Sequence, residues 1–367
     1  MLLLSGNPPG QAAVDAVAAV APGRVNVVDG RTAFGAEYQA SWPDAPQIRG
    51  SLRAQGQAGE GEGSTQQERD DMLAAAEVVV CGFPYPLDLR RRAPNLRWVH
   101  SVNAGASNFR QPFTGAQADI WGADGVTLTT SRGSNGNLPI AEYALASILM
   151  WAKGLPQGLR DAAAGQFSGR EVYGSQLLQS KTVGIVGLGG IGAELAKLAS
   201  GIGLRVIATR RTIDPDAPLP EGVSELLPAA ELPALLKHSD FVVLAVQWSP
   251  ETEHLIGEPE LRLMRPTATL INVARGEVVD TAALTVALRE RRIASASLDV
   301  YEGEFDSLPP EELWSLPNVL ITPHTSGGVE ADVAADHVRG MELFKRNLGL
   351  FLAGAELENA VDWQRGY

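Results

Sequence analysis

Residues 181–211, KTVGIVGLGGIGAELAKLASGIGLRVIATRR, constrain the fold of this chain more than any other segment. An apolar run at 183–186 is long enough for a buried strand, and the apolar residues that follow recur with the spacing of one helix face. Gly201 and Gly203 end this helix before a second apolar run at 204–208. The segment therefore predicts a strand, a turn, a helix and a second strand.

The turn between the first strand and the helix has the pattern G-x-G-x-x-G. In such a unit the three glycines allow a tight turn, close approach of the backbone to a pyrophosphate, and close packing of the helix on the sheet. The helix N-terminus adds unpaired N–H groups and the positive end of the helix dipole. A glycine-rich turn alone is a weak signal, but the complete unit indicates a dinucleotide site. The expected cofactor contacts are Gly187, Gly189, Gly190, Ile191 and Gly192.

The second strand ends in Thr209, Arg210 and Arg211, where NAD-binding units of this type carry an acid for the adenosine ribose. Arginine can instead form charge-assisted hydrogen bonds to a 2′-phosphate. We therefore predict NADP as the preferred cofactor, with NAD possible, and Arg210 and Arg211 as its contacts. The alternative is that both arginines are solvated residues at a strand end.

Composition excludes several classes of protein. The 367 residues suit two domains, and a net charge of −13 argues against a nucleic-acid surface, which needs clustered positive charge. The single cysteine, Cys81, excludes internal disulfides and lies in an apolar run, so we expect a buried small residue in a cytoplasmic protein. The opening MLLLSGNPPG has no basic leader and a short apolar run, so neither a signal peptide nor a membrane span is expected. No metal site is predicted.

Short apolar or β-branched segments alternate with helix-like segments along the whole chain. In the first half, strands are expected at 1–4, 25–28, 78–81, 96–102 and 126–130. In the second half, they are expected at 183–186, 204–208, 241–246, 269–274, 296–300 and 319–322. The alternation predicts parallel sheets with covered faces, and six strands is the count of a doubly wound nucleotide-binding domain.

A helical pattern returns at 329–353, and we expect this helix to pack back on the first domain. The predicted fold is α/β, with a discontinuous substrate domain and a dinucleotide-binding domain, at 1–135 plus 327–367 and 136–326. Residues 44–71 are rich in glycine, glutamine and glutamate, and are expected to form a long surface insertion without regular structure. Residues 359–367 are expected to be a polar tail.

Three ionisable residues, Arg275, Glu304 and His324, fall at or just beyond expected strand ends. The C-terminal ends of parallel strands face the ligand crevice, so these side chains could converge there. Histidine can exchange a proton near neutral pH, a carboxylate can orient its ring, and arginine can bind a substrate carboxylate and polarise a carbonyl. Each residue alone is more often structural, and it is the set on a dinucleotide fold that predicts reduction of a 2-keto acid. Val273 and Ala274, before Arg275, are expected to contact the cofactor.

Small residues follow the expected strand at 96–102. Backbone N–H groups exposed past a parallel strand can hold a carboxylate, although such segments are often plain turns. The expected substrate contacts are Asn103, Ala104, Gly105 and Ala106.

Six segments together resemble the D-isomer-specific 2-hydroxyacid dehydrogenases over nearly the full length of the chain. They are GLGGIG, NVARGEVVD, LDVYEGE, LITPHTSGG, PIAEY and the closing VDWQRGY. The resemblance implies two Rossmann-like domains, of which the substrate domain is flavodoxin-like, and a homodimer joined through the nucleotide domain. It also implies that Arg275 holds the substrate, that His324 is the acid/base with Glu304 as its partner, and that Asp299 lies near the nicotinamide carboxamide.

Some positions depart from the family pattern. Phe305 replaces a proline, Asn103 replaces a frequent glycine, and Gln247 with Trp248 replaces a small-or-proline pair beside the cofactor. These changes bear on substrate and cofactor choice more than on the reaction. The leading expectation is a reductase of glyoxylate or hydroxypyruvate.

Two alternatives stay open. One is oxidation of another small anion, formate or phosphite, although Gly136 stands where the formate enzymes have asparagine. The other is a non-catalytic, nucleotide-sensing protein similar to the family's corepressors. Rapid turnover of a 2-keto acid would separate both from the leading expectation.

Overall fold

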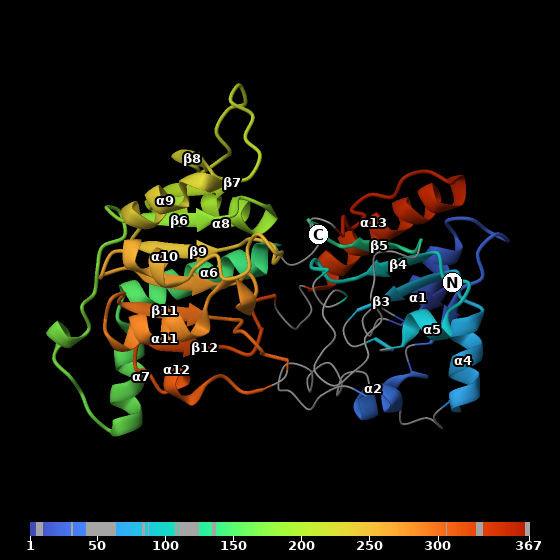
Figure 1. Cartoon of the computed structure of the whole chain (residues 1–367), viewed down its shortest axis with the longest axis horizontal. Coiled ribbons are helices and arrows are strands. Elements are labelled where there is room, and N and C mark those ends of the chain that lie inside the picture. The colour runs from blue at the N-terminus through green and yellow to red at the C-terminus, as the bar shows by residue number, and fades with distance from the viewer. Residues whose placement is uncertain are drawn as a thin grey trace. The chain divides into compact units, whose positions relative to one another are not determined.

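The computed structural model describes residues 1–4, 10–30, 32–41, 64–82, 85–86, 88–106, 109, 125–133, 137–305, 307–327 and 333–363. The chain divides into two compact units (Figure 1). The N-terminal unit contains Met1–Asn135, Phe305–Leu308 and Val329–Tyr367, and the central unit contains Gly136–Glu304 and Pro309–Gly328. Among the described residues, no helix is both long and apolar enough to cross a membrane.

The N-terminal unit is built on a five-stranded parallel sheet in the order β2-β1-β3-β4-β5. This is the flavodoxin-like order predicted for the first domain. The strands are β1 (Leu2–Leu3), β2 (Val28–Asp29), β3 (Val78–Cys81), β4 (Trp98–Ser101) and β5 (Thr127–Thr130). The helices are α1 (Gly10–Ala18), α2 (Gly35–Ser41), α4 (Gln66–Ala74), α5 (Leu89–Arg92) and α13 (Val333–Ala353).

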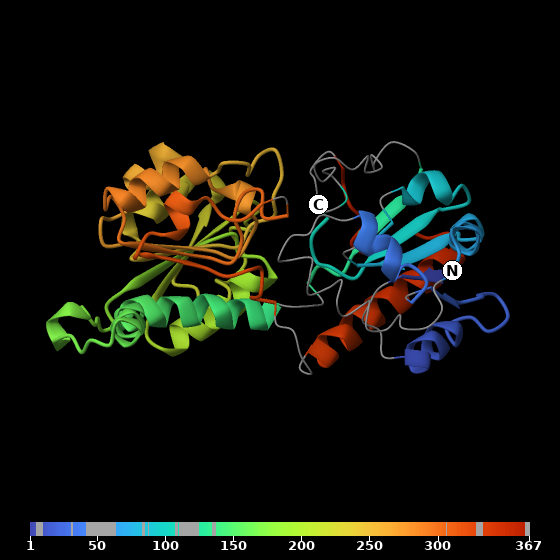
Figure 2. The same ribbon diagram turned by 90° about the horizontal axis from the view of Figure 1, so that it is seen from below.

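Helices cover both faces of this sheet (Figure 2), which explains why its central strands are apolar without interruption. Alternate strand residues enter two separate cores. Val78 and Val80 pack with residues of α1 and α13, whereas Val79 and Cys81 pack with residues of α2, α4 and α5. Cys81 is a free thiol and fully buried, as predicted, and burial raises the pKa of its thiol.

Two sequence predictions for this unit are wrong in part. Residues 66–71 were expected in an unstructured insertion but begin α4, which Thr65 and Glu68 start with a capping box. Residues 44–63 of the expected insertion lie outside the described residues. Only part of the expected polar tail is described, and this part packs on the sheet: Ala360 pairs with Thr129, and the Val361 N–H donates to the Leu128 carbonyl at 2.8 Å. Residues 364–367 lie outside the described residues.

His100 in β4 is a buried neutral histidine. The residue is 1% exposed, and its two ring nitrogens lie 2.8 Å from the Thr129 hydroxyl and 3.3 Å from the Ser131 hydroxyl. Burial lowers the pKa of His100 to about 3. The folded protein therefore resists protonation at a site that the unfolded chain protonates readily.

We expect His100 to make the protein less stable in mild acid. Because its folded pKa lies below the unfolded value of about 6.5, the unfolded chain binds the extra proton between these values. The contribution of His100 to the free energy of unfolding is complete above pH 6.5. It is lost as pH falls towards 3, by at most about 1.4 kcal/mol per pH unit. His100→Gln should therefore flatten the dependence of unfolding free energy on pH, measured by urea titration at pH 7, 6 and 5. His238→Gln, at an exposed histidine, is the control, and equal slopes for wild type and His100→Gln would contradict this account.

The central unit contains a seven-stranded parallel sheet in the order β12-β11-β10-β9-β6-β7-β8. Counted from β6, this is the doubly wound order 3-2-1-4-5-6 with one more strand at the end. Its strands are β6 (Thr182–Val186), β7 (Arg205–Arg210), β8 (Glu225–Pro228), β9 (Phe241–Leu244), β10 (Thr269–Asn272), β11 (Ser295–Leu298) and β12 (Val319–Ile321). The predicted fold class is confirmed, but the predicted count of six strands is wrong because β8 was not expected.

The helices of the central unit lie on both faces of the sheet (Figure 2). One face carries α6 (Asn137–Ala152) and α8 (Gly190–Gly201), which pack on Val243 and Ile271. The other face carries α9 (Leu232–His238), α10 (Glu258–Leu263), α11 (Thr281–Arg289) and α12 (Glu311–Trp314). Another helix, α7 (Leu155–Ala164), and three short 3₁₀ helices complete the unit, at Arg170–Val172, Ala229–Glu231 and Gly276–Val278.

Candidate functional site

The glycine-rich turn joins β6 to α8 at the point where the strand order of the central sheet reverses. Gly187 has φ +98°, a conformation that L side chains rarely adopt. A Cβ on Gly192 would overlap the Gly187 carbonyl oxygen, so glycine there permits the close packing of helix on turn. A Cβ on Gly189, in contrast, would meet no described atom within 4 Å. Backbone conformation therefore explains why residue 187 is glycine, and close packing explains why residue 192 is glycine. Neither applies to Gly189, whose small size leaves the backbone open to a ligand.

The other residues expected at this turn are also placed. Gly190 is the first residue of α8, and a Cβ there would overlap the Asn137 amide, while Ile191 is half-buried. Gly189, the N-cap residue, forms no side-chain cap, so the N-terminus of α8 keeps backbone N–H groups for an anion. These residues fit the pyrophosphate of a dinucleotide.

The end of β7 lies beside this turn. The Leu188 N–H donates to the Thr209 carbonyl at 2.8 Å, and the next residue, Arg210, is exposed. Within the described part of the chain, Arg210 has no carboxylate partner, whereas Arg211 lies 3.6 Å from Glu251. Arg210 is thus the better placed of the two arginines for a further negative charge.

Gln247 and Trp248, which depart from the family pattern, follow β9. Trp248 is 7% exposed and packs in the core of the central unit. The Gln247 carbonyl accepts a hydrogen bond from the Thr252 hydroxyl at 2.7 Å. The large residue at 248 is therefore accommodated by the protein core.

Arg275 follows β10 in a turn fixed by Asn272. The buried Asn272 amide donates to the Arg275 carbonyl at 2.9 Å and accepts from the Ala274 N–H at 3.0 Å. A Cβ on the next residue, Gly276, would overlap the backbone of Tyr301. The turn carrying Arg275 consequently packs directly on the loop that leads to Glu304. Val273 and Ala274, both expected to contact the cofactor, are 5% exposed.

Glu304 and His324 form a pair. The His324 Nδ1 lies 3.0 Å from Glu304 Oε1, and the Glu304 side chain is 3% exposed against 32% for His324. No described residue hydrogen-bonds to Glu304 Oε2. A buried carboxylate on Nδ1 fixes the ring orientation and leaves Nε2 as the nitrogen for proton exchange. Phe305, the next residue, packs against the core of the N-terminal unit.

Asp299 directly follows β11, is 1% exposed and holds the loop that carries His324. Its carboxylate accepts hydrogen bonds from the Thr322 hydroxyl at 2.7 Å, the Thr325 N–H at 2.8 Å and the Ser326 N–H at 2.9 Å. Its carbonyl accepts from the His324 N–H at 2.9 Å. Asp299 therefore has a bracing role that the sequence did not reveal.

Three further residues near this set, Thr322, Tyr143 and Glu277, carry no role that was predicted from the sequence. Thr322 hydrogen-bonds to both Asp299 and Tyr143. Tyr143 is the last residue of the PIAEY motif, which contributed to the family resemblance but gave this residue no role. Glu277 follows Gly276. Burial raises the pKa of the Glu277 carboxyl, and the negative charge of the nearby Glu304 raises it further. Among the described residues, no group of three or more histidine, cysteine, aspartate or glutamate side chains could hold a metal ion.

The residues expected to bind the substrate carboxylate follow β4 in the N-terminal unit. The Asn103 N–H donates to the Ser101 hydroxyl at 3.2 Å, and its carbonyl accepts from the Ser131 N–H at 3.1 Å. Within the described residues, the N–H groups of Ala104, Gly105 and Ala106 have no acceptor. Three successive backbone donors are thus available there. Gly136, the position compared with the formate enzymes, lies outside the described residues.

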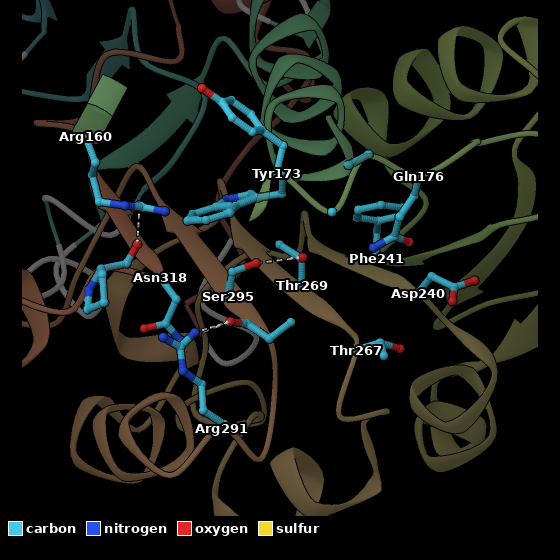
Figure 3. Close-up of a pocket in the computed structure, with 15 residues that line it drawn as sticks. Arg160, Tyr173, Gln176, Asp240, Phe241, Thr267, Thr269, Arg291, Ser295 and Asn318 are labelled. Carbon is cyan, nitrogen blue, oxygen red and sulfur yellow. Dashed lines mark hydrogen bonds between the residues drawn. The ribbon is translucent and has the colours of Figure 1, made fainter. Parts of the chain in front are cut away.

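A cavity of about 250 Å³ opens at the N-terminal ends of strands in the central sheet (Figure 3). Its walls include Phe241, Thr269 and Ser295, the first residues of β9, β10 and β11. Arg160 and Tyr173 close it from the segment around α7. None of the predicted site residues lines it, and Arg275 and Asp299 follow the opposite ends of β10 and β11.

Known proteins with similar sequences and structures define the family. A sequence model described as "D-isomer specific 2-hydroxyacid dehydrogenase, NAD binding domain" matches residues 145–326. A glyoxylate reductase of Thermococcus gammatolerans is 47% identical over 191 residues, which is 51% of this chain and 52% of that protein. The chain thus spans about half the length of this relative.

Two other similarities extend further along the chain. A glyoxylate reductase of Korarchaeum cryptofilum is 33% identical over 290 residues, covering 76% of this chain and 80% of that protein. The crystal structure of a D-isomer specific 2-hydroxyacid dehydrogenase from Xanthobacter autotrophicus Py2, in complex with NADPH and MES, superposes with a TM-score of 0.70. It is 27% identical and covers 100% of this chain and 98% of that one. With its NAD-binding domain and two parallel-sheet units, the chain belongs to the D-isomer-specific 2-hydroxyacid dehydrogenase family.

Proposed function

We propose that this protein transfers hydride between a nicotinamide cofactor and a small 2-keto or 2-hydroxy acid such as glyoxylate or hydroxypyruvate. The observation that carries this proposal is the pair of His324 with the buried Glu304, beside the Arg275 turn of a dinucleotide-binding fold. The glyoxylate reductases of T. gammatolerans and K. cryptofilum support the substrate class.

Each proposed catalytic residue has a defined task. When bound, the nicotinamide supplies or accepts the hydride. His324 exchanges a proton at the substrate oxygen through Nε2, while Glu304 stabilises the protonated ring. Arg275 binds the substrate carboxylate and polarises the carbonyl, because its planar guanidinium can donate two parallel hydrogen bonds. The N–H groups of Ala104, Gly105 and Ala106 are proposed as further donors to the carboxylate.

The test is oxidation of NADPH and NADH by the purified protein with glyoxylate, hydroxypyruvate, pyruvate and bulkier 2-keto acids. We expect rapid turnover with glyoxylate or hydroxypyruvate. Tight dinucleotide binding without turnover of any acid would reject the proposal. It would favour the small-anion or nucleotide-sensing alternatives.

We also propose that the cofactor is NADP in preference to NAD. Support comes from Arg210, which is exposed at the end of β7 and has no carboxylate partner in the described part of the chain. The NADPH complex of the X. autotrophicus protein is consistent with this choice. Arg211, already beside Glu251, is proposed as a weaker contact.

Arg210→Ala should weaken NADPH binding by about ten- to a hundredfold and leave NADH binding nearly unchanged. The reason is the loss of one charge-assisted hydrogen bond, worth ~1.5–3 kcal/mol, to the 2′-phosphate. The measurement is the dissociation constant of each dinucleotide by fluorescence titration. Arg205→Ala is the matched control, because Arg205 begins the same strand and pairs with Glu225 at 2.6 Å. Equal catalytic efficiency of the wild type with NADH and NADPH would show that Arg210 does not select the cofactor.

The remaining proposals concern organisation. We propose that residues 1–135 plus 327–367 form the substrate domain, that 136–326 form the dinucleotide-binding domain, and that the protein is a cytoplasmic homodimer. Exposed apolar side chains on the segment around α7 support the dimer, namely Leu155, Leu159, Phe167, Val172 and Leu177. The free thiol of Cys81 supports a reducing compartment. Light scattering would measure the mass, and cell fractionation the location.

A further inference from the structure

We propose that Tyr143 is a positioning residue for His324, acting through Thr322 and Asp299. The inference rests on the proposed function in taking His324 as the residue that exchanges the proton. The new element is a hydroxyl chain, defined here as the Tyr143 and Thr322 hydroxyls, which ends on the Asp299 carboxylate. This hydroxyl chain holds the loop on which His324 lies.

The hydrogen bonds that link Tyr143, Thr322 and Asp299 all run in one direction. The Tyr143 hydroxyl lies 2.6 Å from Thr322 Oγ1, and the Thr322 hydroxyl donates to Asp299 Oδ1 at 2.7 Å. A hydroxyl has a single proton, and a carboxylate only accepts, so the Thr322 proton is committed to Asp299. Tyr143 is therefore the donor to Thr322. Burial raises the pKa of Tyr143, which keeps this donor protonated at neutral pH.

The carboxylate at the end of the chain holds the loop on both sides of His324. Before His324, Asp299 Oδ1 binds the Thr322 side chain, and after it, the carboxylate accepts from the N–H groups of Thr325 and Ser326. The Asp299 carbonyl binds the His324 N–H itself. Asp299 is thus the common acceptor for this loop.

His324 needs such support because its backbone is in the left-handed region, with φ +55°. A residue other than glycine persists in this conformation only where its surroundings hold it. The ring is fixed separately by Glu304, so the loop and the side chain have independent restraints. Loosening the loop should misplace Nε2 for proton transfer without removing any group that touches cofactor or substrate.

Tyr143 reaches this loop from a different element. It lies in α6, which packs on the sheet with α8, whereas Thr322 follows β12 at the sheet edge. A second contact of the same kind joins the Trp151 Nε1 to the Ser297 hydroxyl at 2.9 Å. The helix therefore supports both β11 and the segment that follows the edge strand β12.

The experiment compares Tyr143→Phe, Thr322→Val and Thr322→Ser with wild type. Tyr143→Phe removes one neutral hydrogen bond and should lower kcat by about two- to tenfold. Thr322→Val also removes a hydrogen bond to a carboxylate and should lower kcat by about ten- to a hundredfold. In both variants KM for the acid and the dissociation constant of NADPH should stay close to wild type. Thr322→Ser keeps the hydroxyl and should restore most of the rate.

Hydrogen exchange supplies a readout that does not depend on turnover. The backbone N–H groups of Thr325 and Ser326 should exchange faster in Tyr143→Phe and Thr322→Val than in wild type, because the carboxylate that holds them is less restrained. Tyr173→Phe is the matched control, since its hydroxyl donates to the Asp161 carboxylate at 3.1 Å elsewhere in the same unit. This control should change neither kcat nor exchange at residues 325 and 326.

The outcomes separate this inference from the proposed function. Unchanged exchange in both variants, or faster exchange with an unchanged kcat in an active enzyme, overturns the positioning role. A wild type that reduces no 2-keto acid overturns the proposed function and with it the proton-transfer role of His324. The exchange data then still decide whether the hydroxyl chain holds the loop.

Discussion

Replacing His324 by alanine is expected to lower kcat by about 10²–10⁴-fold, the usual contribution of a positioned acid/base. Alanine removes the only proposed proton carrier, while Glu304 stays buried in place. NADPH should still bind, because the glycine-rich turn and α8 do not depend on this side chain. Steady-state kinetics with the preferred acid, together with the dissociation constant of NADPH, would test both parts.

His238→Ala is the control for this variant. His238 ends α9, is exposed, and has its ring Nδ1 2.7 Å from the Ala234 carbonyl oxygen of its own helix. The His238→Ala variant should reduce the acid at the same rate as wild type. A near-normal rate for His324→Ala would remove His324 from the mechanism.

Replacing Arg275 by glutamine should lower kcat/KM by about 10²–10³-fold, as expected for loss of a donor to a developing negative charge. Glutamine keeps a polar side chain but loses the charge and the bidentate geometry. Arg275→Lys should recover only part of the activity, because an ammonium group cannot form two parallel hydrogen bonds to a carboxylate. The measurement is kcat and KM for the acid with each variant.

Arg262→Gln controls for the removal of an arginine in the same unit. Arg262 lies in α10, is exposed, and pairs with Glu258 at 2.7 Å. If Arg275→Gln and Arg262→Gln had the same small effect, Arg275 could not be the substrate-binding residue.

Much of the fold followed from the sequence because both sheets are parallel and covered on both faces. Strands of this kind are continuous apolar runs, and VVVC at β3 and FVVL at β9 were predicted at or close to their observed bounds. The missed strand, β8, has the sequence ELLP and lies at the sheet edge, where only one neighbour is needed. Its polar first residue and terminal proline made it resemble a loop.

The missed helix α4 has a different explanation. Its sequence, QQERDDMLA, is polar nearly throughout, and Leu73 is its only residue that is fully buried. Hydrophobic periodicity therefore gave no signal. The signal that was present is the capping box of Thr65 and Glu68.

The candidate site was predictable where its parts are local in sequence. The glycine-rich turn and the strand-end positions of Arg275 and His324 could be read from neighbouring residues. The contact between Tyr143 and Thr322 could not, because it joins positions 179 residues apart, from a helix on one face and a strand at the edge. Only the order of the strands brings them together.

All three proposed catalytic residues, Arg275, Glu304 and His324, belong to the central unit. The groups that bind the cofactor and transfer the proton would then be inherited together, as parts of one domain. The other unit could exchange its loops over evolutionary time, and so acquire new acids as substrates, without rebuilding the chemistry. For protein engineering, this arrangement directs libraries for altered substrate choice to the segment after β4 and leaves the central unit unchanged.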